Sequence, residues 1–438
     1  MVQRSKMLII SMPFNVGIGG FFREYKTLPL VAKMLKNSLD NDIELYIPFN
    51  VFRALYKYFL SSCDHDPKCA YEFLIKHVVE DLSTVEKRSR YSISVNEKII
   101  EVMLFNLREH ISRGNVSIFG FARNVYDLVK SYSLTSHIGF FGAQHYISRE
   151  EIRHCQSFSH YFKGVDYMYV THETVDALSS AMCLSRLNKS KIIILLHNPP
   201  EGYERVLLNN ILSSNSLIGI LGVSPASFLG LPDRHVQLRV VFPGSAIELE
   251  TPERISLRKN ERLIIYFGRL SREKGIFDLL KAWTYVEKEA PNLMLLIVGS
   301  PDTEFIRRKI LDYSRKYNIR WLPPQKRHKL IEYVALSKVF VLPSYREGYS
   351  LSILEALSLK TSVVAYRIPA LYLLYCRLPN VLLIDTGNIK QLAEAIIRMA
   401  ESEFQSNSML DTFLYLHSSW ENVARAEFET LMSIISHH

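Results

Sequence analysis

The chain has 438 residues, of which 48% are hydrophobic and 22% are charged. This length and composition provide for two globular domains, each with a core of its own. The net charge of +9 is spread over both halves, without a block of like charges. Such a distribution excludes a dedicated nucleic-acid binder and fits a protein that meets anionic small molecules or an anionic membrane surface.

The first residues predict a strand and no secretory signal. A basic start leads into an apolar run that is cut off by Pro13, Asn15 and Gly17, which is too short for a signal peptide. No stretch approaches the ~18 uninterrupted apolar residues that a membrane span needs. The odd, scattered cysteines suit a reducing compartment better than a disulfide framework. We therefore expect a cytoplasmic protein, with peripheral contact to the inner membrane face left open. The cysteines are Cys63, Cys69, Cys155, Cys183 and Cys376.

Short apolar runs alternate with helical patterns along the chain, which predicts parallel sheets covered by helices. The strand candidates of the first half are 7–11, 43–47, 137–141, 166–170, 191–196, 217–223 and 237–242. Those of the second half are 263–267, 293–298, 319–322, 338–342, 362–366 and 381–384. The predicted fold class is α/β, with two doubly wound, Rossmann-like units.

The boundary between the units is predicted near residue 245. Pro243, Gly244 and Ser245 are followed by the polar stretch 248–260, which has few apolar anchors and is typical of a linker. The first domain would span 1–245 and the second would start at 246. Residues 51–115 show little strand pattern and many Lys, Glu and Leu positions, so we interpret them as a helical insertion in the first domain.

Two segments of this insertion have alternative interpretations. The aromatic and basic run 51–60 favours a helix packed on its own domain, and contact with a membrane surface is the alternative. The cluster from Cys63 to Cys69 contains Asp64, His65 and Asp66, but it lacks the paired Cys-x-x-Cys spacing of structural zinc. We therefore predict no metal site there.

A glycine-rich turn with Gly17, Gly19 and Gly20 follows the first strand and precedes a helix. Such a turn brings backbone N–H groups close to a phosphate at a helix N-terminus. Phe22 stands where the dinucleotide-binding fingerprint requires a third glycine. The turn alone is a weak indication of ligand binding, and the broken fingerprint disfavours a NAD-linked oxidoreductase.

Two histidines end predicted strands of the first domain. His172 follows strand 166–170, and His197 follows strand 191–196. A polar residue at the carboxyl end of a parallel strand projects into the ligand crevice of such sheets, so His197 is placed to contact a sugar. For His172 a structural role is favoured.

The segment 268–275 follows a strand and opens a helix through Ile276 and Trp283. Gly268 permits a tight exit from the strand, and Arg269 and Lys274 set two cations at the carboxyl edge of the sheet. Arg can bind a diphosphate bidentately, and Lys acts as a movable point charge. The alternative is that both are solvated loop charges.

Glu347 and Glu355 stand with seven residues between them, after the strand at 338–342 and around a turn at Gly348. If a helix follows the turn, the two carboxylates lie roughly 12 Å apart along its axis, at about 1.5 Å per residue. This separation suits a ligand with hydroxyls at both ends and a charged centre, such as a nucleotide sugar. An idle Glu355 among apolar neighbours would be costly to bury, so we predict a partner for it.

These motifs resemble the retaining glycosyltransferases of family 4, within the GT-B superfamily, over nearly the whole chain except 51–115. The closest matches are Gly-Arg-Leu-Ser-Arg-Glu-Lys-Gly at 268–275, Leu-Leu-Ile-Val-Gly at 295–299, Leu-Pro-Ser at 342–344, Arg-Glu-Gly-Tyr-Ser-Leu-Ser-Ile-Leu-Glu-Ala at 346–356 and Ser-Val-Val-Ala at 362–365. The resemblance implies two domains that face each other across a cleft. It also implies a second domain at 246–416 and a final helix at 417–438 that crosses back to the first domain.

The resemblance also implies a role for each matching position. Catalytic roles would fall to Arg269 and Lys274 at the donor diphosphate, to Glu347 at the transferred sugar and to His197 near the reacting carbon. Glu355 would bind the ribose hydroxyls. The remaining donor-binding residues would be Gly17, Gly19, Gly20, Gly268, Gly348, Tyr349, Ser350 and Leu351.

Three positions depart from the family pattern. Ser350 replaces a common glycine, although a serine hydroxyl can serve at a helix start. Lys360 replaces a usual glycine and Ser362 a usual proline, which affects the local turn more than the chemistry.

The expected reaction moves a hexose from a nucleotide-diphosphate sugar to a hydroxyl of a glycan, a lipid-linked glycan or a small molecule, with retention of configuration. Cations and helix amides would stabilise the leaving diphosphate, so no metal or other cofactor is expected. Domain closure would exclude water. The alternatives are a non-catalytic GT-B relative that binds a nucleotide sugar or glycan, and a GT-B nucleotide-sugar epimerase.

Overall fold

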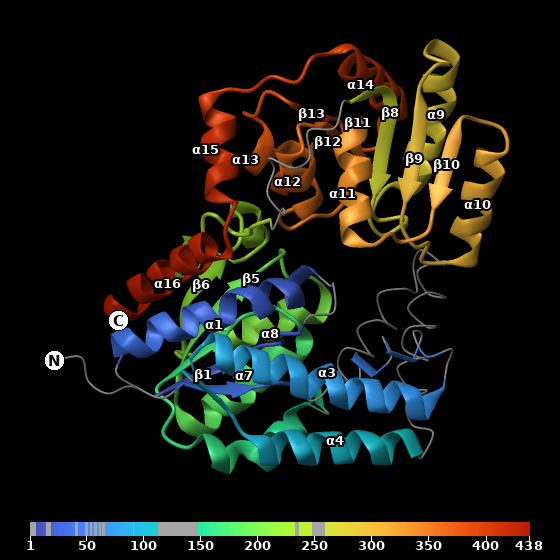
Figure 1. The fold of residues 1–438 in the computed structure, drawn as a ribbon. Helices are drawn as coiled ribbons and strands as arrows, with labels where there is room; N and C mark the ends of the chain where they lie inside the picture. The colour runs from blue at the N-terminus through green and yellow to red at the C-terminus, as the bar shows by residue number, and fades with distance from the viewer. Residues whose placement is uncertain are drawn as a thin grey trace. The chain divides into compact units, whose positions relative to one another are not determined.

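The computed structural model divides the chain into two compact units (Figure 1). The first unit comprises Met1–Val223, Ser227–Phe242 and Ala424–His438, and the second comprises Ser224–Ala226 and Pro243–Val423. The structure describes residues 6–14, 19–39, 43–48, 51–52, 55–56, 59–60, 63, 66–90, 92–112, 148–149, 151–232, 236–247 and 259–438.

The first unit is built on a sheet of parallel strands in the order β3-β2-β1-β4-β5-β6-β7. The strands are β1 (Met7–Ile10), β2 (Ile43–Tyr46), β3 (Ile93–Val95), β4 (Tyr167–Val170), β5 (Lys191–Leu196), β6 (Leu217–Gly222) and β7 (Gln237–Val240). Its helices include α1 (Gly19–Leu39), α3 (Pro67–Arg88), α4 (Glu97–Ser112), α7 (Val175–Asn188) and α8 (Gly202–Leu212). The last helix, α16 (Trp420–Ser436), packs on this unit, with Ile434 against Gly219 of β6. This confirms the predicted return of the chain to the first domain.

The described residues of 51–115 are mostly helical, as expected, and they also contribute the edge strand β3, which pairs with β2 in parallel. The interpretation of this segment as a helical insertion missed that strand. Val51, Phe52, Leu55, Tyr56 and Phe59 are all buried. Their burial supports the interpretation of 51–60 as a helix packed on its own domain.

The second unit has a parallel sheet in the order β10-β9-β8-β11-β12-β13. The strands are β8 (Asn260–Phe267), β9 (Met294–Val298), β10 (Ile319–Leu322), β11 (Ser337–Leu342), β12 (Ser362–Tyr366) and β13 (Val381–Ile384). The helices are α9 (Ile276–Glu289), α10 (Glu304–Ser314), α11 (Arg327–Leu336), α12 (Leu351–Ser358), α13 (Pro369–Tyr375), α14 (Ile389–Glu401) and α15 (Ser408–Leu416). Helix α14 packs on α9 and on β11, β12 and β13, and it has the amphipathic pattern that this position requires.

Each sheet has one point where the strand order reverses. From β8 the chain adds β9 and β10 on one side and then β11, β12 and β13 on the other. The first sheet reverses in the same way between β1 and β4. Ligands of doubly wound sheets bind at the carboxyl ends of the strands at such reversals, so the segments after β8, β11, β1 and β4 are where a site is expected.

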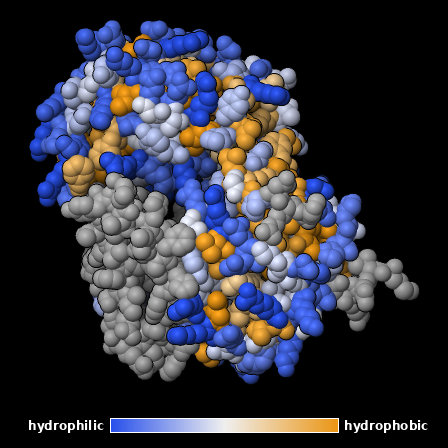
Figure 2. Space-filling view, turned by 180° about the vertical axis from the view of Figure 1, so that it is seen from behind, coloured by the Kyte–Doolittle hydropathy of each residue, from blue (hydrophilic) through white to orange (hydrophobic). Residues whose placement is uncertain are grey.

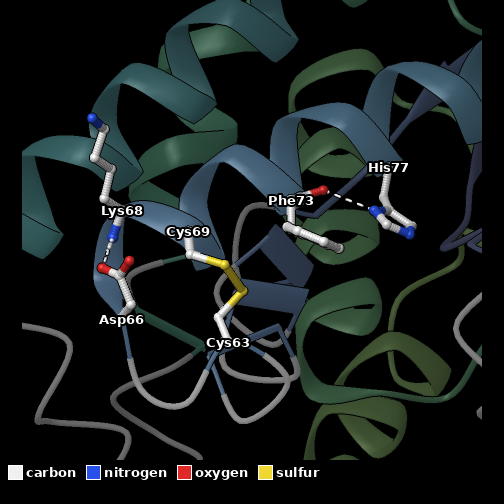
Figure 3. The surroundings of a disulfide bond; sticks show 6 residues. All are labelled: Cys63, Asp66, Lys68, Cys69, Phe73 and His77. Atoms are coloured by element: carbon white, nitrogen blue, oxygen red, sulfur yellow. Dashed lines mark hydrogen bonds between the residues drawn. A yellow bond between two sulfur atoms is a disulfide. The ribbon is translucent and has the colours of Figure 1, made fainter.

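A disulfide joins Cys63 to Cys69 across the start of α3, with a Cα–Cα distance of 5.9 Å (Figure 3). Asp66 caps the same helix, because its side chain accepts a hydrogen bond from the Lys68 amide at 3.0 Å. The expectation of unpaired cysteines is therefore wrong for this pair, and neither thiol is left to bind a metal. Cys155, Cys183 and Cys376 are free.

In the upper part of Figure 2, hydrophilic residues cover much of the face of the second unit that is shown, with hydrophobic residues among them. In the described part of the chain, no helix combines the length and the apolar character that crossing a membrane requires. The strand predicted at 137–141 lies outside the described residues.

Candidate functional site

The loop that follows β8 is held tightly by its own strand. The buried Tyr266 hydroxyl donates to the carbonyl of Arg269 at 2.9 Å and lies 3.5 Å from the carbonyl of Lys274. Gly275 begins α9 with φ of 73°, and a Cβ there would lie 1.8 Å from the Pro343 carbonyl oxygen. Only glycine fits at this position. Its close approach to Pro343 brings the loop after β8 against the end of β11.

This approach joins two of the predicted residues. The Lys274 ammonium donates to Glu347 Oε1 at 2.7 Å and to the Arg346 carbonyl at 3.1 Å. The side chains of Lys274 and Glu347 are 19% and 10% exposed, so the ion pair is only partly solvated. Arg269, in the same loop after β8, is exposed. A lysine and an arginine thus stand at the strand reversal, where an anion would be neutralised.

The turn before α12 takes an unusual conformation. Gly348, Tyr349 and Ser350 end the loop 343–350 that connects β11 to this helix, and Leu351 is its first residue. Ser350 has φ of 60° and makes no side-chain capping hydrogen bond. The Tyr375 hydroxyl holds the turn by donating to the Tyr349 carbonyl at 2.7 Å. A helix start without a side-chain cap can bind an anion through its backbone N–H groups.

Tyr349 also connects this turn to the segment after α15. Its hydroxyl lies 2.5 Å from His417 Nε2, and His417 Nδ1 lies 2.6 Å from the Phe413 carbonyl. Because a carbonyl can only accept, Nδ1 carries the proton and Nε2 accepts from Tyr349. The His417 carbonyl in turn accepts from the Ile247 amide at 2.9 Å. Burial lowers the pKa of His417 to about 4, which keeps the ring neutral.

Glu355 has the partner that its apolar surroundings predict. Its Oε1 lies 2.5 Å from Arg327 Nη1 at the start of α11. The Glu355 side chain is 14% exposed and that of Arg327 is 49% exposed. Burial raises the pKa of Glu355, and Arg327 opposes that rise. Sequence reasoning missed Arg327, which stands after Pro323 and Pro324 and resembles any basic residue on a helix surface.

In the first unit, His197 lies in a buried polar cluster at the carboxyl ends of β4 and β5. Its Nε2 is 3.0 Å from the Thr171 carbonyl, and its backbone amide donates to Glu173 Oε2 at 2.8 Å. Its ring stacks on that of His172, with centroids 4.5 Å apart. The Thr171 carbonyl fixes the proton on Nε2 and leaves the Nδ1 lone pair as the acceptor. Burial, and then His172 and Arg23, lower the pKa of His197 well below its usual value.

Glu24 of α1 completes this cluster. Its Oε2 accepts from the Ser11 hydroxyl at 2.5 Å and from the Met12 amide at 2.6 Å, directly after β1. Burial raises the pKa of Glu24, and His172 opposes that rise. One ligand atom each of Glu24, His172 and His197 lie within 4.8 Å of one another. This group could hold a cation, although hydrogen bonds already engage Glu24 Oε2 and His197 Nε2.

A buried ion pair lies next to the cluster. Arg23 Nη2 is 2.7 Å from Glu427 Oε2 of α16, and the Tyr169 hydroxyl donates to Glu427 Oε1 at 2.7 Å. Sequence reasoning missed Arg23, Glu24, Glu173 and Glu427. The available signal was the adjacent charges Arg23 and Glu24, three residues after the last glycine of the turn.

The glycine turn is described only in part. Gly17 lies outside the described residues, and Gly19 and Gly20 form the start of α1. The structure therefore joins Lys274 to Glu347, pairs Glu355 with Arg327, leaves Arg269 exposed and buries His197.

Residues 248–412 match the family model described as glycosyl transferases group 1. A D-inositol 3-phosphate glycosyltransferase of Corynebacterium urealyticum is 28% identical over 228 residues, which are 47% of this chain and 53% of that enzyme. The chain spans only 39% to 53% of the length of the first curated relatives that it matches.

Two crystal structures resemble the whole chain. Alr3699/HepE of Anabaena, in complex with UDP and glucose, has a TM-score of 0.59 at 15% identity and covers 98% of this chain and 100% of its own. A glycosyltransferase of Rickettsia africae has a TM-score of 0.55 at 14% identity, with 100% of both chains covered. Identities this low establish the fold alone. With two parallel-sheet α/β units and this likeness, the chain has the GT-B fold, and the group 1 match lies in its second unit.

Proposed function

We propose that this chain is a retaining glycosyltransferase of family 4, which moves a hexose from a nucleotide-diphosphate sugar to a hydroxyl acceptor. The observation that carries the proposal is the Lys274–Glu347 pair, with its 2.7 Å contact at the strand reversal of the second sheet. The glycosyl transferases group 1 match over the same unit supports it.

Charge stabilisation of the leaving group is the main catalytic device. The donor diphosphate would lie against Arg269, Lys274 and the first amides of α12. Lys274 would then exchange part of its contact with Glu347 for a phosphate oxygen. Donors that are fixed in place before the reaction stabilise the charge that develops on the leaving nucleoside diphosphate without further reorganisation. The exposed Arg269 is free to bind two phosphate oxygens at once.

The two glutamates bind the two ends of the donor. Glu347 would accept hydrogen bonds from the transferred sugar, and Glu355 would accept them from the ribose hydroxyls. His197 would contact the sugar near the reacting carbon as a hydrogen-bond acceptor, because its proton is held on the side of the Thr171 carbonyl. The acceptor hydroxyl attacks the carbon from the face that the diphosphate leaves, so the configuration is retained. The departing phosphate oxygen takes the acceptor's proton.

We expect UDP to be the nucleotide, because Alr3699/HepE was solved with UDP and glucose. The acceptor would be a glycan, a lipid-linked glycan or a small molecule, and contact with a membrane surface remains part of this proposal. Val51, Phe52, Leu55, Tyr56 and Phe59 are buried and would not make that contact. The cytoplasmic location stays a prediction, and the Cys63–Cys69 disulfide weighs against a reducing compartment.

A panel of UDP-, GDP- and ADP-sugars tests donor binding by thermal shift, because a ligand that binds only the folded state raises the melting temperature. We expect UDP-sugars to stand out and Glu355→Ala to abolish the shift. Glu304→Ala is the matched control, since Glu304 is an exposed helix carboxylate that also pairs with an arginine. A flat panel for the unchanged protein would contradict the proposal.

Product analysis separates the alternatives. A transferase attaches the sugar to an acceptor, an epimerase releases a sugar of altered configuration, and a non-catalytic relative binds the donor without turnover. We expect Lys274→Met to lower turnover by roughly 10²- to 10³-fold, as for the loss of one charge-stabilising donor. Turnover should persist in EDTA, and the anomeric signal of the product by NMR should show retention.

A further inference from the structure

We propose that Arg327 is a positioning residue for donor binding, whose guanidinium holds the Glu355 carboxylate ionised and oriented to accept both ribose hydroxyls. The inference rests on the proposed function and extends it to a residue outside the motifs that predicted the site.

The contact is specific in its geometry. Arg327 Nη1 lies 2.5 Å from Glu355 Oε1, and the two residues come from the first turn of α11 and the second turn of α12. The Glu355 side chain is 14% exposed, whereas Arg327 is 49% exposed. A guanidinium from the solvent side thus reaches a carboxylate that is otherwise mostly surrounded by protein.

The position of Arg327 runs against the local electrostatics. It is the first residue of α11, with Lys326 before it and His328 and Lys329 after it. Cations are unfavourable at a helix N-terminus, where the helix dipole is positive. A half-exposed ion pair contributes only about 0 to 1 kcal/mol to stability. Folding stability therefore does not account for an arginine at this place, whereas the state of the Glu355 carboxyl does.

Among the described residues, the Arg327 guanidinium is the charge that stabilises the ionised form of Glu355. Among the described elements, β12 and α15 pack on α12, and α11 reaches it through Arg327. The titratable side chains of β12 and α15 are Tyr366, Asp411 and Tyr415, and none of these is a cation. Beside Arg327, those of α11 are His328, Lys329, Glu332 and Tyr333. Burial raises the pKa of Glu355 and Arg327 opposes that rise, so removal of the guanidinium moves the pKa further up.

Protonation would change what Glu355 can bind. A carboxylate accepts hydrogen bonds on both oxygens, whereas a protonated carboxyl turns one of them into a donor. A ribose offers two neighbouring hydroxyls to the ionised form. The loss of Arg327 should therefore weaken the binding of ribonucleotides as the pH falls, and a nucleotide without the 2′-hydroxyl should be affected less.

The test uses the full chain and isothermal titration calorimetry with UDP and 2′-deoxy-UDP between pH 5 and 8. We expect Arg327→Gln to weaken UDP binding roughly tenfold near pH 6. In this variant, the pH at which half of the UDP affinity is lost on the acid side should rise by about 1 to 3 pH units. The preference for UDP over 2′-deoxy-UDP should shrink. Arg327→Lys should move this acid-side midpoint most of the way back to that of the unchanged protein. Arg307→Gln is the matched control, since Arg307 is 48% exposed and pairs with a helix glutamate.

Equal losses for UDP and 2′-deoxy-UDP, with an unmoved midpoint, would overturn the proposal and show that Arg327 contacts the nucleotide itself. If the proposed function were wrong, the result would differ: the unchanged protein would not bind UDP, or Glu355→Ala would bind UDP as tightly as the unchanged protein does. The melting temperature of each variant, measured without nucleotide, shows that the fold is intact.

Discussion

The two units carry their ion pairs in different environments. Arg23 and Glu427 of the first unit are 4% and 1% exposed, and the pair links α1 to α16. In the second unit, Lys274 and Glu347 are 19% and 10% exposed, and Arg327 is 49% exposed. A buried pair cannot exchange partners without a large desolvation cost, whereas a partly solvated pair can. The comparison indicates that the first pair maintains the fold and the second is available to a ligand.

The largest expected effect comes from breaking the buried pair. Arg23→Met leaves Glu427 buried without its counter-charge, and we expect a loss of about 3–5 kcal/mol in the free energy of unfolding. Lys274→Met should cost at most about 1 kcal/mol, because its partner keeps some access to water. Urea denaturation followed by circular dichroism measures both.

A second variant separates the lost charge from the lost packing. Arg23→Met combined with Glu427→Leu removes both charges, and we expect it to recover much of the stability, because apolar residues often replace a buried pair without loss. Equal stabilities of Arg23→Met and Lys274→Met would show that the two environments do not differ in the way their exposure indicates.

His417 extends the comparison to a buried group of the second unit. Its pKa falls from 6.5 to about 4 on folding, chiefly because of burial. Above pH ~6.5, His417 is neutral in both the folded and the unfolded chain, so its contribution to the free energy of unfolding is fully present. As the pH falls, His417 binds a proton in the unfolded chain, whereas in the folded chain it stays neutral until about pH 4. This shift corresponds to about 3 kcal/mol lost over that interval, at ~1.36 kcal/mol per unit.

Urea denaturation at pH 7, 6, 5 and 4 should therefore show a smaller acid-induced loss of stability for His417→Gln than for the unchanged chain. A glutamine amide can still accept from the Tyr349 hydroxyl but does not titrate. His328→Gln is the control, since His328 is exposed on α11. The same pH dependence in all three proteins would show that His417 does not titrate differently in the folded state.

The buried strands could be predicted from the sequence almost to the residue. The strands at Ile319–Leu322 and Ser362–Tyr366 were expected at these bounds, because a strand of a parallel sheet forms an apolar run between turns. β8 starts earlier than predicted, at Asn260, since its first residues are polar and exposed. β3 was missed because it has only three residues and carries Ser94 at its centre.

In the candidate site too, residues within local motifs could be predicted and those with distant partners could not. Lys274, Glu347 and Glu355 could be predicted because they lie in local motifs at the ends of strands. Arg327 could not, since it is 28 residues from Glu355 in the sequence. Glu427 lies 258 residues from Tyr169, its hydrogen-bond partner. A charge on a helix shows no sequence signal for a partner that only the tertiary fold supplies.

The smallest expected effect concerns a departure from the family pattern. Lys360 follows α12 with φ of 56°, and the Thr361 amide donates to the Ala356 carbonyl at 2.8 Å, which is the hydrogen bond of a Schellman turn. The turn that a glycine would form is therefore kept by a lysine at a steric cost. We expect Lys360→Gly to stabilise the chain by about 1 kcal/mol, because the relief of left-handed strain exceeds the entropy that glycine adds to the unfolded state. Lys281→Gly, at an exposed position inside α9, should destabilise it by about 1 kcal/mol. Opposite signs for the same substitution would show that backbone conformation, rather than the lost charge, decides the result, and a loss of stability at both positions would contradict this.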